Sequence, residues 1–275
     1  MMELIFYLSL IFIAGAVLLF YFYAFFQQKK WFNRATLFLV LGSVFLTGVL
    51  FISGLKAHHH PSTNPFEIYN FLAFLVLMVY FISEYKFKIR MLGAFLPLVA
   101  LLFLFLSLFS SRNSFPLIKE LPDSLFTLHT AFSLLGVTFF VLSFIASFFY
   151  LLQENFLKDK KMKGIFRLPS LSLLERTSHF SLLTGYPFLT FGVILGFMLA
   201  GTKLAGEWML DPKIGWTLLV WIFYSFAFLR RISGKLRGRR FAWVLIISFM
   251  MIVLGYSLIN YFSHFHGFIF SRGQL

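Results

Sequence analysis

Histidine is the residue in this sequence with the widest capacity for chemistry. Neutral imidazole binds transition metals and is a common axial ligand of heme iron. The chain contains no cysteine, so it forms no disulfide and supplies no thiol of its own. Its seven histidines fall into four groups: His58 to His60, His129, His179, and the pair His264 and His266.

The elements that must position these histidines are membrane helices. Only 12% of the 275 residues are charged and 60% are apolar, whereas soluble domains carry about 25% charged residues. The net charge of +14 raises nucleic acid as a partner. However, Lys and Arg occur in short clusters between long apolar runs, a pattern typical of loops between membrane spans. The sequence therefore predicts contact with a lipid bilayer and no binding of nucleic acid.

A membrane helix needs roughly 20 apolar residues to cross the hydrocarbon core. The apolar runs predict an all-α, polytopic transmembrane bundle of about eight helices. The fifth is long, the seventh is short, and the basic segment 153–180 is expected to be partly helical. The predicted spans are 4–26, 36–55, 66–83, 91–109, 126–152, 181–204, 214–230 and 241–262. We expect a single integral membrane domain over 1–275, with four N-terminal helices in 1–125 and four more in 126–268.

The distribution of positive charge predicts the orientation. Four alternate loops, at 27–35, 84–90, 153–180 and 230–240, hold 18 of the 24 Lys and Arg residues. Because cytoplasmic loops are enriched in Lys and Arg, these four loops are expected to be cytoplasmic. The protein is then multi-pass, with both termini outside.

This orientation places six of the seven histidines on the outer side, and only His179 on the inner side. The outer loop before the seventh span adds Trp208, Asp211 and Lys213. Tryptophan offers a flat apolar face, and a cation can neutralise carboxylates such as the propionates of heme. The outer face is therefore the candidate site for heme.

Each of these signals has another interpretation. His58 to His60 can be a solvated polar stretch, and His129 can be an amphipathic anchor at the interface. Trp208 can belong to the aromatic belt of the membrane. A transporter or a metal-binding membrane protein that uses His58 to His60 is an alternative function, as is a b-type cytochrome. Transporters place ionisable residues near mid-membrane, and no predicted span has one at its centre; Pro97 and Pro187 are interpreted as kinks.

Several stretches in the second half resemble, in order, the membrane heme-handling family of cytochrome c assembly proteins, the CcsA, CcmC and HemX group. The resemblance covers about 126–268. The stretches are Leu128-His129-Thr130, Tyr150-Leu151-Leu152-Gln153-Glu154, Leu157-Lys158, Leu168-Pro169-Ser170-Leu171, Leu174-Glu175, Asp211-Pro212-Lys213, Trp216, Trp221, Asn260 and Phe265-His266-Gly267-Phe268. In the first half, CcsA-type members read G-H-x-P-x-S-N-x-Y-E where this chain has His59, Pro61, Asn64, Phe66 and Glu67.

The chain also departs from the family pattern. The outer "WWD" signature of the family, W-G-x-x-W-x-W-D-x-x-E, is degenerate here and keeps only Trp208 and Asp211 of its six defined residues. CcsA-type members carry an inner histidine where this chain has Leu229, so the inner heme site of some members is expected to be absent. The replaced signature positions are Leu204, Ala205, Leu210 and Ile214. With these departures, the chain resembles a divergent or HemX-like member of the family.

The resemblance implies that His129 and His266 together ligate one heme b at the outer face, with Trp208, Asp211 and Lys213 around it. His59 is a further metal candidate. Imidazole must be neutral to ligate iron, so binding is expected to weaken below the free histidine pKa of about 6.5. Gly136 would let the flat ring lie close to the fifth span, although packing between helices is its ordinary role.

The function implied is heme delivery at the outer face of a bacterial-type cytoplasmic membrane during cytochrome c maturation. The chain would act as an assembly factor rather than a conventional enzyme. Its partners would be heme, apocytochrome c, a thiol-redox protein and a CcsB-like membrane protein. The alternative is a HemX-like regulator or scaffold of heme biosynthesis without catalysis.

Overall fold

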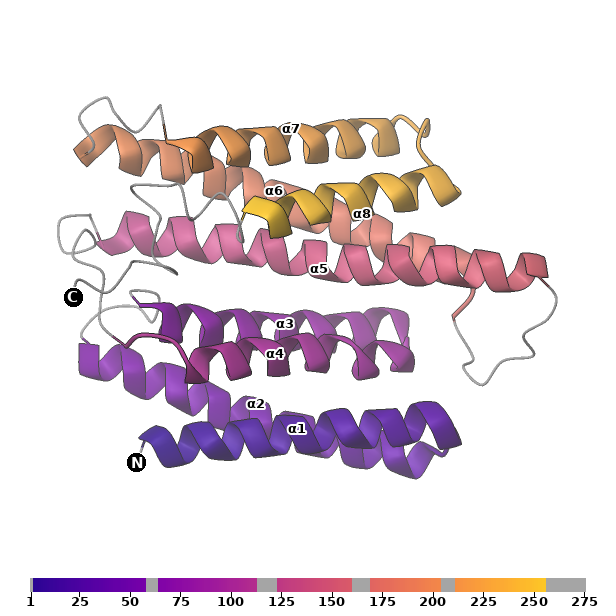
Figure 1. The fold of residues 1–275 in the computed structure, drawn as a ribbon, viewed down its shortest axis with the longest axis horizontal. Helices are drawn as coiled ribbons and strands as arrows, with labels where there is room; N and C mark the ends of the chain where they lie inside the picture. Colours follow the sequence, from indigo (N-terminus) through magenta and orange to yellow (C-terminus); the bar gives the residue numbers. More distant parts are fainter. Residues whose placement is uncertain (1, 58–63, 113–122, 160–168, 204–210, 256–275) are drawn as a thin grey trace. The chain divides into compact units, whose positions relative to one another are not determined.

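The computed structural model describes residues 2–57, 64–112, 123–159, 169–203 and 211–255. This part of the chain is helical and contains no strand (Figure 1). One short 3₁₀ helix, η1, precedes α4. The helices are α1 (Met2–Phe26), α2 (Lys29–Ala57), α3 (Pro65–Phe87), η1 (Arg90–Ala94), α4 (Leu96–Leu108), α5 (Asp123–Asp159), α6 (Leu171–Lys203), α7 (Pro212–Ile232) and α8 (Gly238–Leu254).

These helices confirm the predicted all-α, polytopic membrane fold. Seven segments of the described chain are long and apolar enough to cross a membrane, and they correspond to α1, α2, α3, η1 with α4, α5, α6 and α7. The described part of α8 has 17 residues, and the rest of the predicted span lies in 256–275, outside the described residues. The fifth helix is long, as predicted, with 37 residues.

Helix α6 begins at Leu171, ten residues before the predicted sixth span, which agrees with the prediction that the segment 153–180 is partly helical. Its first turns contain Glu175, Arg176 and His179, which lower the local hydropathy. The helix continues through them because Glu175 and His179 are hydrogen-bonded to Arg231 of α7.

The two prolines interpreted as kinks differ in position. Pro187 lies inside α6, as predicted, whereas Pro97 lies in the first turn of α4, where proline fits the helix without a kink.

Two helices begin at residues that the family resemblance had singled out. The side chain of Asn64 accepts a hydrogen bond from the backbone N–H of Glu67 and caps α3, and Pro65 occupies the first helical position. Asp211 caps α7 in the same way by accepting from the backbone N–H of Lys213, and Pro212 follows it. Each pair matches the preference of helix starts for an Asn or Asp cap followed by proline.

The chain divides into two compact units. Unit 1 comprises Met1–Asn113 and Leu152–Leu173, and unit 2 comprises Ser114–Leu151 and Leu174–Leu275. In unit 1, α1 packs along α2 and α3 packs along α4. The aromatic rings of Phe20 and Tyr80 meet edge to face in the interior of unit 1, with centroids 5.8 Å apart.

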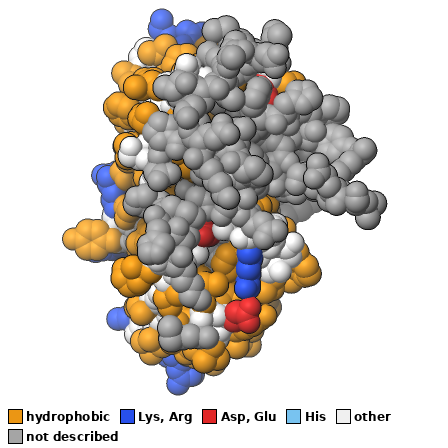
Figure 2. All heavy atoms as spheres, turned by 90° about the vertical axis from the view of Figure 1, so that its left-hand side faces the viewer, with side chains coloured by type: hydrophobic (Ala, Val, Ile, Leu, Met, Phe, Trp, Pro, Cys, Tyr) orange, Lys and Arg blue, Asp and Glu red, His pale blue; other side chains and the backbone are white. Residues whose placement is uncertain are grey.

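The interior of unit 2 is formed by α5, α6, α7 and α8. Phe140 of α5 stacks on Tyr224 of α7 with ring centroids 3.6 Å apart, and both side chains are fully buried. Large apolar side chains also lie on the outside of both units, and Phe51 and Ile222 are 66% and 58% exposed. Figure 2, which views one end of the molecule, shows mostly hydrophobic side chains among the described atoms. Such a surface is expected of helices that contact lipid.

Candidate functional site

His129 lies in the second turn of α5 and is half-buried. Its Nδ1 is 2.8 Å from the backbone carbonyl oxygen of Gly192 in α6. A carbonyl oxygen can only accept, so the Nδ1 of His129 carries the hydrogen and donates it. In a neutral imidazole, Nε2 then keeps its lone pair and can ligate a metal. The second ring nitrogen of a metal-binding histidine is typically fixed by a partner of this kind.

A row of small residues on α6 allows this contact. Gly185, Gly192 and Gly196 are spaced seven and four residues apart, so they lie on one face of the helix. A methyl group at Gly196 would lie 2.8 Å from Cε1 of His129, and one at Gly192 would lie 2.4 Å from Oγ of Ser133. The imidazole of His129 therefore packs against α6, in space that a side chain larger than that of Gly196 would occupy.

Gly136 faces the same row from α5. A methyl group on Gly136 would lie 2.8 Å from the backbone nitrogen of Leu189 and 3.1 Å from the carbonyl oxygen of Gly185. The space beside Gly136 is thus filled by the backbone of α6. This geometry confirms the helix-packing interpretation of Gly136 and leaves no room there for a heme ring.

Asp211 and Lys213 lie at the start of α7, in the same unit as His129. Asp211 is 4% exposed, and its Oδ1 accepts from the backbone N–H of Lys213 at 2.8 Å. The Lys213 ammonium interacts electrostatically with both Asp211 and His129. The structure therefore gathers three of the predicted site residues at one end of unit 2, where α5 and α7 begin and α6 ends. We call it the His129 end.

The other predicted site residues lie outside the described residues. They are Trp208, His266 and His59; His264, the other member of the C-terminal histidine pair, also lies there. Their roles stay predictions.

The two other tryptophans of the family resemblance hold α7 in place. The indole N–H of Trp216 donates to the carbonyl oxygen of Met251 in α8 at 2.8 Å. The indole N–H of Trp221 donates to Oγ1 of Thr190 in α6 at 3.0 Å. In membrane proteins such side-chain hydrogen bonds connect neighbouring helices. Trp216 and Trp221 thus fix the helix whose first turn carries Asp211 and Lys213.

The opposite end of unit 2 contains a charged network centred on Arg231, and we call it the Arg231 end. Arg231 donates to Oε1 of Glu175 at 2.6 Å, to Nδ1 of His179 at 3.1 Å and to the carbonyl oxygen of Leu236 at 3.0 Å. The same Glu175 oxygen accepts from the backbone N–H of Gly238 at 3.1 Å. These bonds connect α6, the end of α7 and the start of α8.

The network determines the chemistry of His179. Because Arg231 can only donate, Nδ1 of His179 is the acceptor, and the neutral ring carries its hydrogen on Nε2. Neither ring nitrogen then offers a free lone pair to a metal. Leu229, at the position of the inner histidine in the family, points outward and is 65% exposed.

Sequence reasoning missed Gly192, Gly196 and the Arg231 network. The seven- and four-residue spacing of the α6 glycines was a signal for close helix packing. Arg231 was counted only as one of several loop charges, and nothing in the sequence pairs it with Glu175, 56 residues away.

In unit 1, Asn64, Phe66 and Glu67 of the first-half resemblance form the start of α3. Glu67 is only 3% exposed, and its Oε1 accepts from Oγ of Ser53 in α2 at 3.0 Å. The guanidinium of Arg112 lies 4.8 Å from the centre of the Phe66 ring and pairs with Glu3 at 2.9 Å. These contacts connect the start of α3 to α1, to α2 and to Arg112, beyond the end of α4.

Comparison with known proteins gives one family. The family model "Cytochrome C assembly protein" matches residues 62–266, well over half of the chain. The chain is 26% identical over 248 residues to the cytochrome c biogenesis protein CcsA of Heterosigma akashiwo, a match that spans 76% of this chain and 77% of the relative. It is 25% identical over 258 residues to protein HemX of Bacillus subtilis, which spans 91% of this chain and 92% of that protein. Protein HemX of Brevibacillus brevis is 26% identical over 250 residues, spanning 90% of this chain and 92% of its own. A helical membrane protein with this match over most of its length belongs to the cytochrome c assembly protein family.

Proposed function

We propose that this protein binds heme at the outer face of the membrane and hands it on during cytochrome c maturation. Family membership supports a role in cytochrome c biogenesis. The observation that carries the heme proposal is the hydrogen bond from Nδ1 of His129 to the carbonyl oxygen of Gly192, at 2.8 Å. It leaves Nε2 as the nitrogen that can ligate iron.

The residues around His129 fit a heme substrate. Heme combines an iron that accepts axial nitrogen ligands with two propionate carboxylates. Nε2 of His129 would supply one axial ligand, and the Lys213 ammonium, which already interacts with His129, would attract a propionate. Asp211 holds Lys213 in place through the N-terminal cap of α7. We propose His266 as the second axial ligand and Trp208 as the residue that covers the porphyrin.

The chain's own chemistry in this role is binding and orientation. It has no cysteine, so it cannot form the thioether bonds of a c-type cytochrome. The thiols would come from apocytochrome c and be kept reduced by a thiol-redox protein, with a CcsB-like membrane protein as a further partner. We therefore propose an assembly factor for heme b rather than a conventional enzyme.

The proposal requires the His129 end to face outward from a bacterial-type cytoplasmic membrane, with both termini outside. Support comes from the 18 of 24 Lys and Arg residues in the four loops predicted to be cytoplasmic. Reporter fusions at residues 160 and 235 should give a cytoplasmic signal, and a fusion at residue 118 should give an external one. An external signal at residue 160 would place the site on the wrong side and contradict delivery at the outer face.

The heme proposal is tested by the absorption spectrum of the protein purified in detergent from heme-replete cells. We expect a Soret band in the wild type, a shifted band in His129→Ala and in His266→Ala, and no heme in the double variant. His264→Ala is the matched control, because His266, and not His264, falls at the histidine of the family's closing segment in Phe265-His266-Gly267-Phe268. Wild-type protein without heme would contradict heme binding.

A second function has specific support. The two HemX relatives match 90% or more of this chain, and four of the six defined positions of the outer signature are replaced. These observations favour a HemX-like regulator or scaffold of heme biosynthesis without heme transfer. Wild-type protein that binds heme but does not support cytochrome c assembly in cells would favour this second function.

A further inference from the structure

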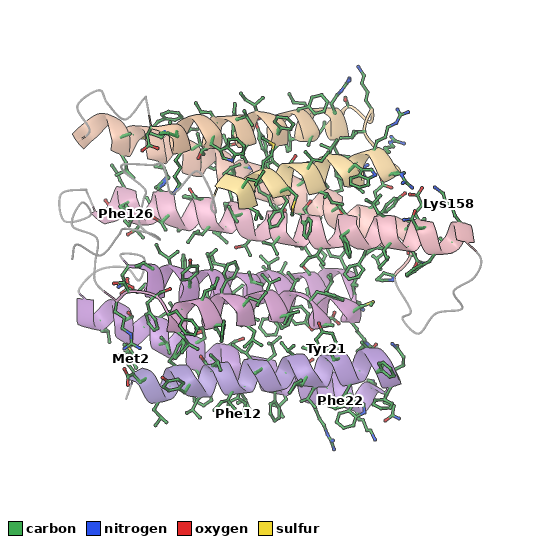
Figure 3. The ribbon with its side chains drawn as sticks, in the orientation of Figure 1. Met2, Phe12, Tyr21, Phe22, Phe126 and Lys158 are labelled. Atoms are coloured by element: carbon green, nitrogen blue, oxygen red, sulfur yellow. The ribbon has the colours of Figure 1, made fainter. Side chains whose placement is uncertain are left out.

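A cavity of about 360 Å³ lies in unit 1, at the end where α1 and α3 finish. In Figure 3 the labels Tyr21 and Phe22 mark this end of α1. Phe20, Ile89 and Met91 form part of its apolar wall, and Gln27, Lys88 and Arg90 contribute polar groups. Small-molecule sites have volumes of roughly 300–1,000 Å³, so the cavity is large enough for one ligand group.

Two turns place these polar residues at the cavity. Gln27 ends α1 and Lys88 ends α3, and both have a φ of 54°, the left-handed conformation that terminates helices. The backbone N–H groups of Gln27 and Lys88 each donate back to their own helix, at 2.8 Å and 2.9 Å. The turns are thus fixed by backbone hydrogen bonds, which leaves the Lys88 side chain available for a ligand.

The cavity is positively charged. The Arg90 guanidinium lies over the Phe32 ring at 5.1 Å, a contact that uses none of its N–H donors. Within the described part of the chain, neither Lys88 nor Arg90 makes a side-chain hydrogen bond. Glu84, which interacts with Arg90, is the only carboxylate known from the described residues to interact with these two cations. Further cations lie near these turns in the sequence, in the first turns of α2 and the last turn of α3: Lys29, Lys30, Arg34 and Lys86.

The position of the cavity in the membrane indicates the kind of ligand that it could bind. α1 and α3 are membrane spans that end beside it, so the cavity lies at the level where phospholipid headgroups meet the hydrocarbon core. A cationic rim next to an apolar wall suits a molecule with an anionic head and an apolar chain. Basic pockets between membrane helices bind anionic headgroups in this way.

We propose that this cavity binds one anionic phospholipid, with its phosphate between Lys88 and Arg90 and an acyl chain along Phe20, Ile89 and Met91. The inference is independent of heme binding, because the cavity lies entirely within unit 1 and His129 lies in unit 2. The headgroup of a lipid, rather than free phosphate, is favoured because Phe20, Ile89 and Met91 offer an apolar wall that free phosphate would leave uncovered.

The test titrates the full-length protein, purified in a neutral detergent, with dihexanoylphosphatidylglycerol and follows the thermal unfolding midpoint. Dihexanoylphosphatidylcholine and inorganic phosphate are the comparison ligands. We expect saturable stabilisation by the phosphatidylglycerol and little effect of the other two. Equal stabilisation of the wild-type protein by dihexanoylphosphatidylcholine would overturn the proposal. Saturable stabilisation by inorganic phosphate alone would overturn it as well.

A pair of double variants then tests the two cations. K88Q/R90Q should weaken phosphatidylglycerol binding about tenfold or more, because it removes two charge-assisted contacts. R34Q/K86Q is the matched control, since it removes the same charge from the same end without touching the cavity wall, and should change binding by less than about twofold. Equal loss in both double variants would show general attraction to a basic surface and would contradict a defined site.

Discussion

Among the described residues, each end of unit 2 contains one histidine that contacts a neighbouring helix, yet the two side chains are held in opposite ways. His129 donates from Nδ1 to the carbonyl oxygen of Gly192, whereas His179 accepts at Nδ1 from Arg231. The first arrangement leaves a lone pair on Nε2, and the second leaves none. The partner of one ring nitrogen therefore decides whether a histidine in this fold can serve as a ligand or only as part of the packing.

The charges at the two ends also differ. At the Arg231 end, the cation is matched by the Glu175 carboxylate at 2.6 Å and by two further acceptors. At the His129 end, Lys213 interacts with Asp211 and with His129 itself. An ammonium group beside a histidine whose Nε2 can act as a ligand suits an anionic metal complex such as heme, which is why the proposed function rests on this end.

The largest expected effect comes from breaking the Arg231 end. Arg231→Ala removes three side-chain hydrogen bonds and leaves Glu175 without its hydrogen-bonded cation, so the free energy of unfolding should fall by about 2 kcal/mol, below the range for fully buried ion pairs. Thermal unfolding in detergent measures this loss of stability. The neighbouring Arg230→Ala removes only a contact with the Phe226 ring and should cost less than about 0.5 kcal/mol. If Arg231→Ala also abolished heme binding while the protein stayed folded, the two ends would not differ in function as we propose.

A smaller and more selective effect is expected at the His129 end. Gly196→Ala places a methyl group 2.8 Å from Cε1 and 3.0 Å from Nδ1 of His129, so the imidazole must move away from the Gly192 carbonyl. Heme affinity, measured by titration of the apoprotein, should fall about tenfold, the equivalent of one weakened ligand contact. Gly201→Ala is the control on the same helix, because no atom lies within 4 Å of its added methyl group. Equal affinity in both variants would show that Gly196 does not position His129.

The smallest expected effect comes from removing His179, the histidine of the Arg231 end. His179→Ala removes one acceptor of Arg231 and should lower unfolding free energy by about 1 kcal/mol or less. The Soret band should keep its position and intensity, because His179 has no lone pair for iron. Loss of the Soret band in His179→Ala, with the outer histidines intact, would overturn the assignment of the ligand to the His129 end.

Much of the fold was predictable because the apolar runs that lipid requires are local features of the sequence. The predicted spans recovered the helices, including the long α5. The predicted sixth span begins ten residues after the start of α6 because Glu175, Arg176 and His179 reduce hydropathy, whereas the hydrogen bonds of Glu175 and His179 to Arg231 come from a distant part of the chain. Long-range pairing of this kind has no local signal.

The candidate site was predictable in the same partial sense. Charge bias and the family resemblance placed His129, Asp211 and Lys213 together, and the structure brings these three into one end of unit 2. The carbonyl of Gly192, which fixes the tautomer of His129, could not be read from residue types, because every residue has a carbonyl group. Only the helix packing selects which one meets the imidazole.

The central claim is that Nε2 of His129 ligates heme iron. The most direct measurement is the absorption spectrum of His129→Ala, purified with heme, before and after addition of free imidazole. We predict a spectrum shifted from that of the wild type, and its return when imidazole occupies the space left by the side chain. A His129→Ala spectrum identical to the wild type without added imidazole would contradict the claim.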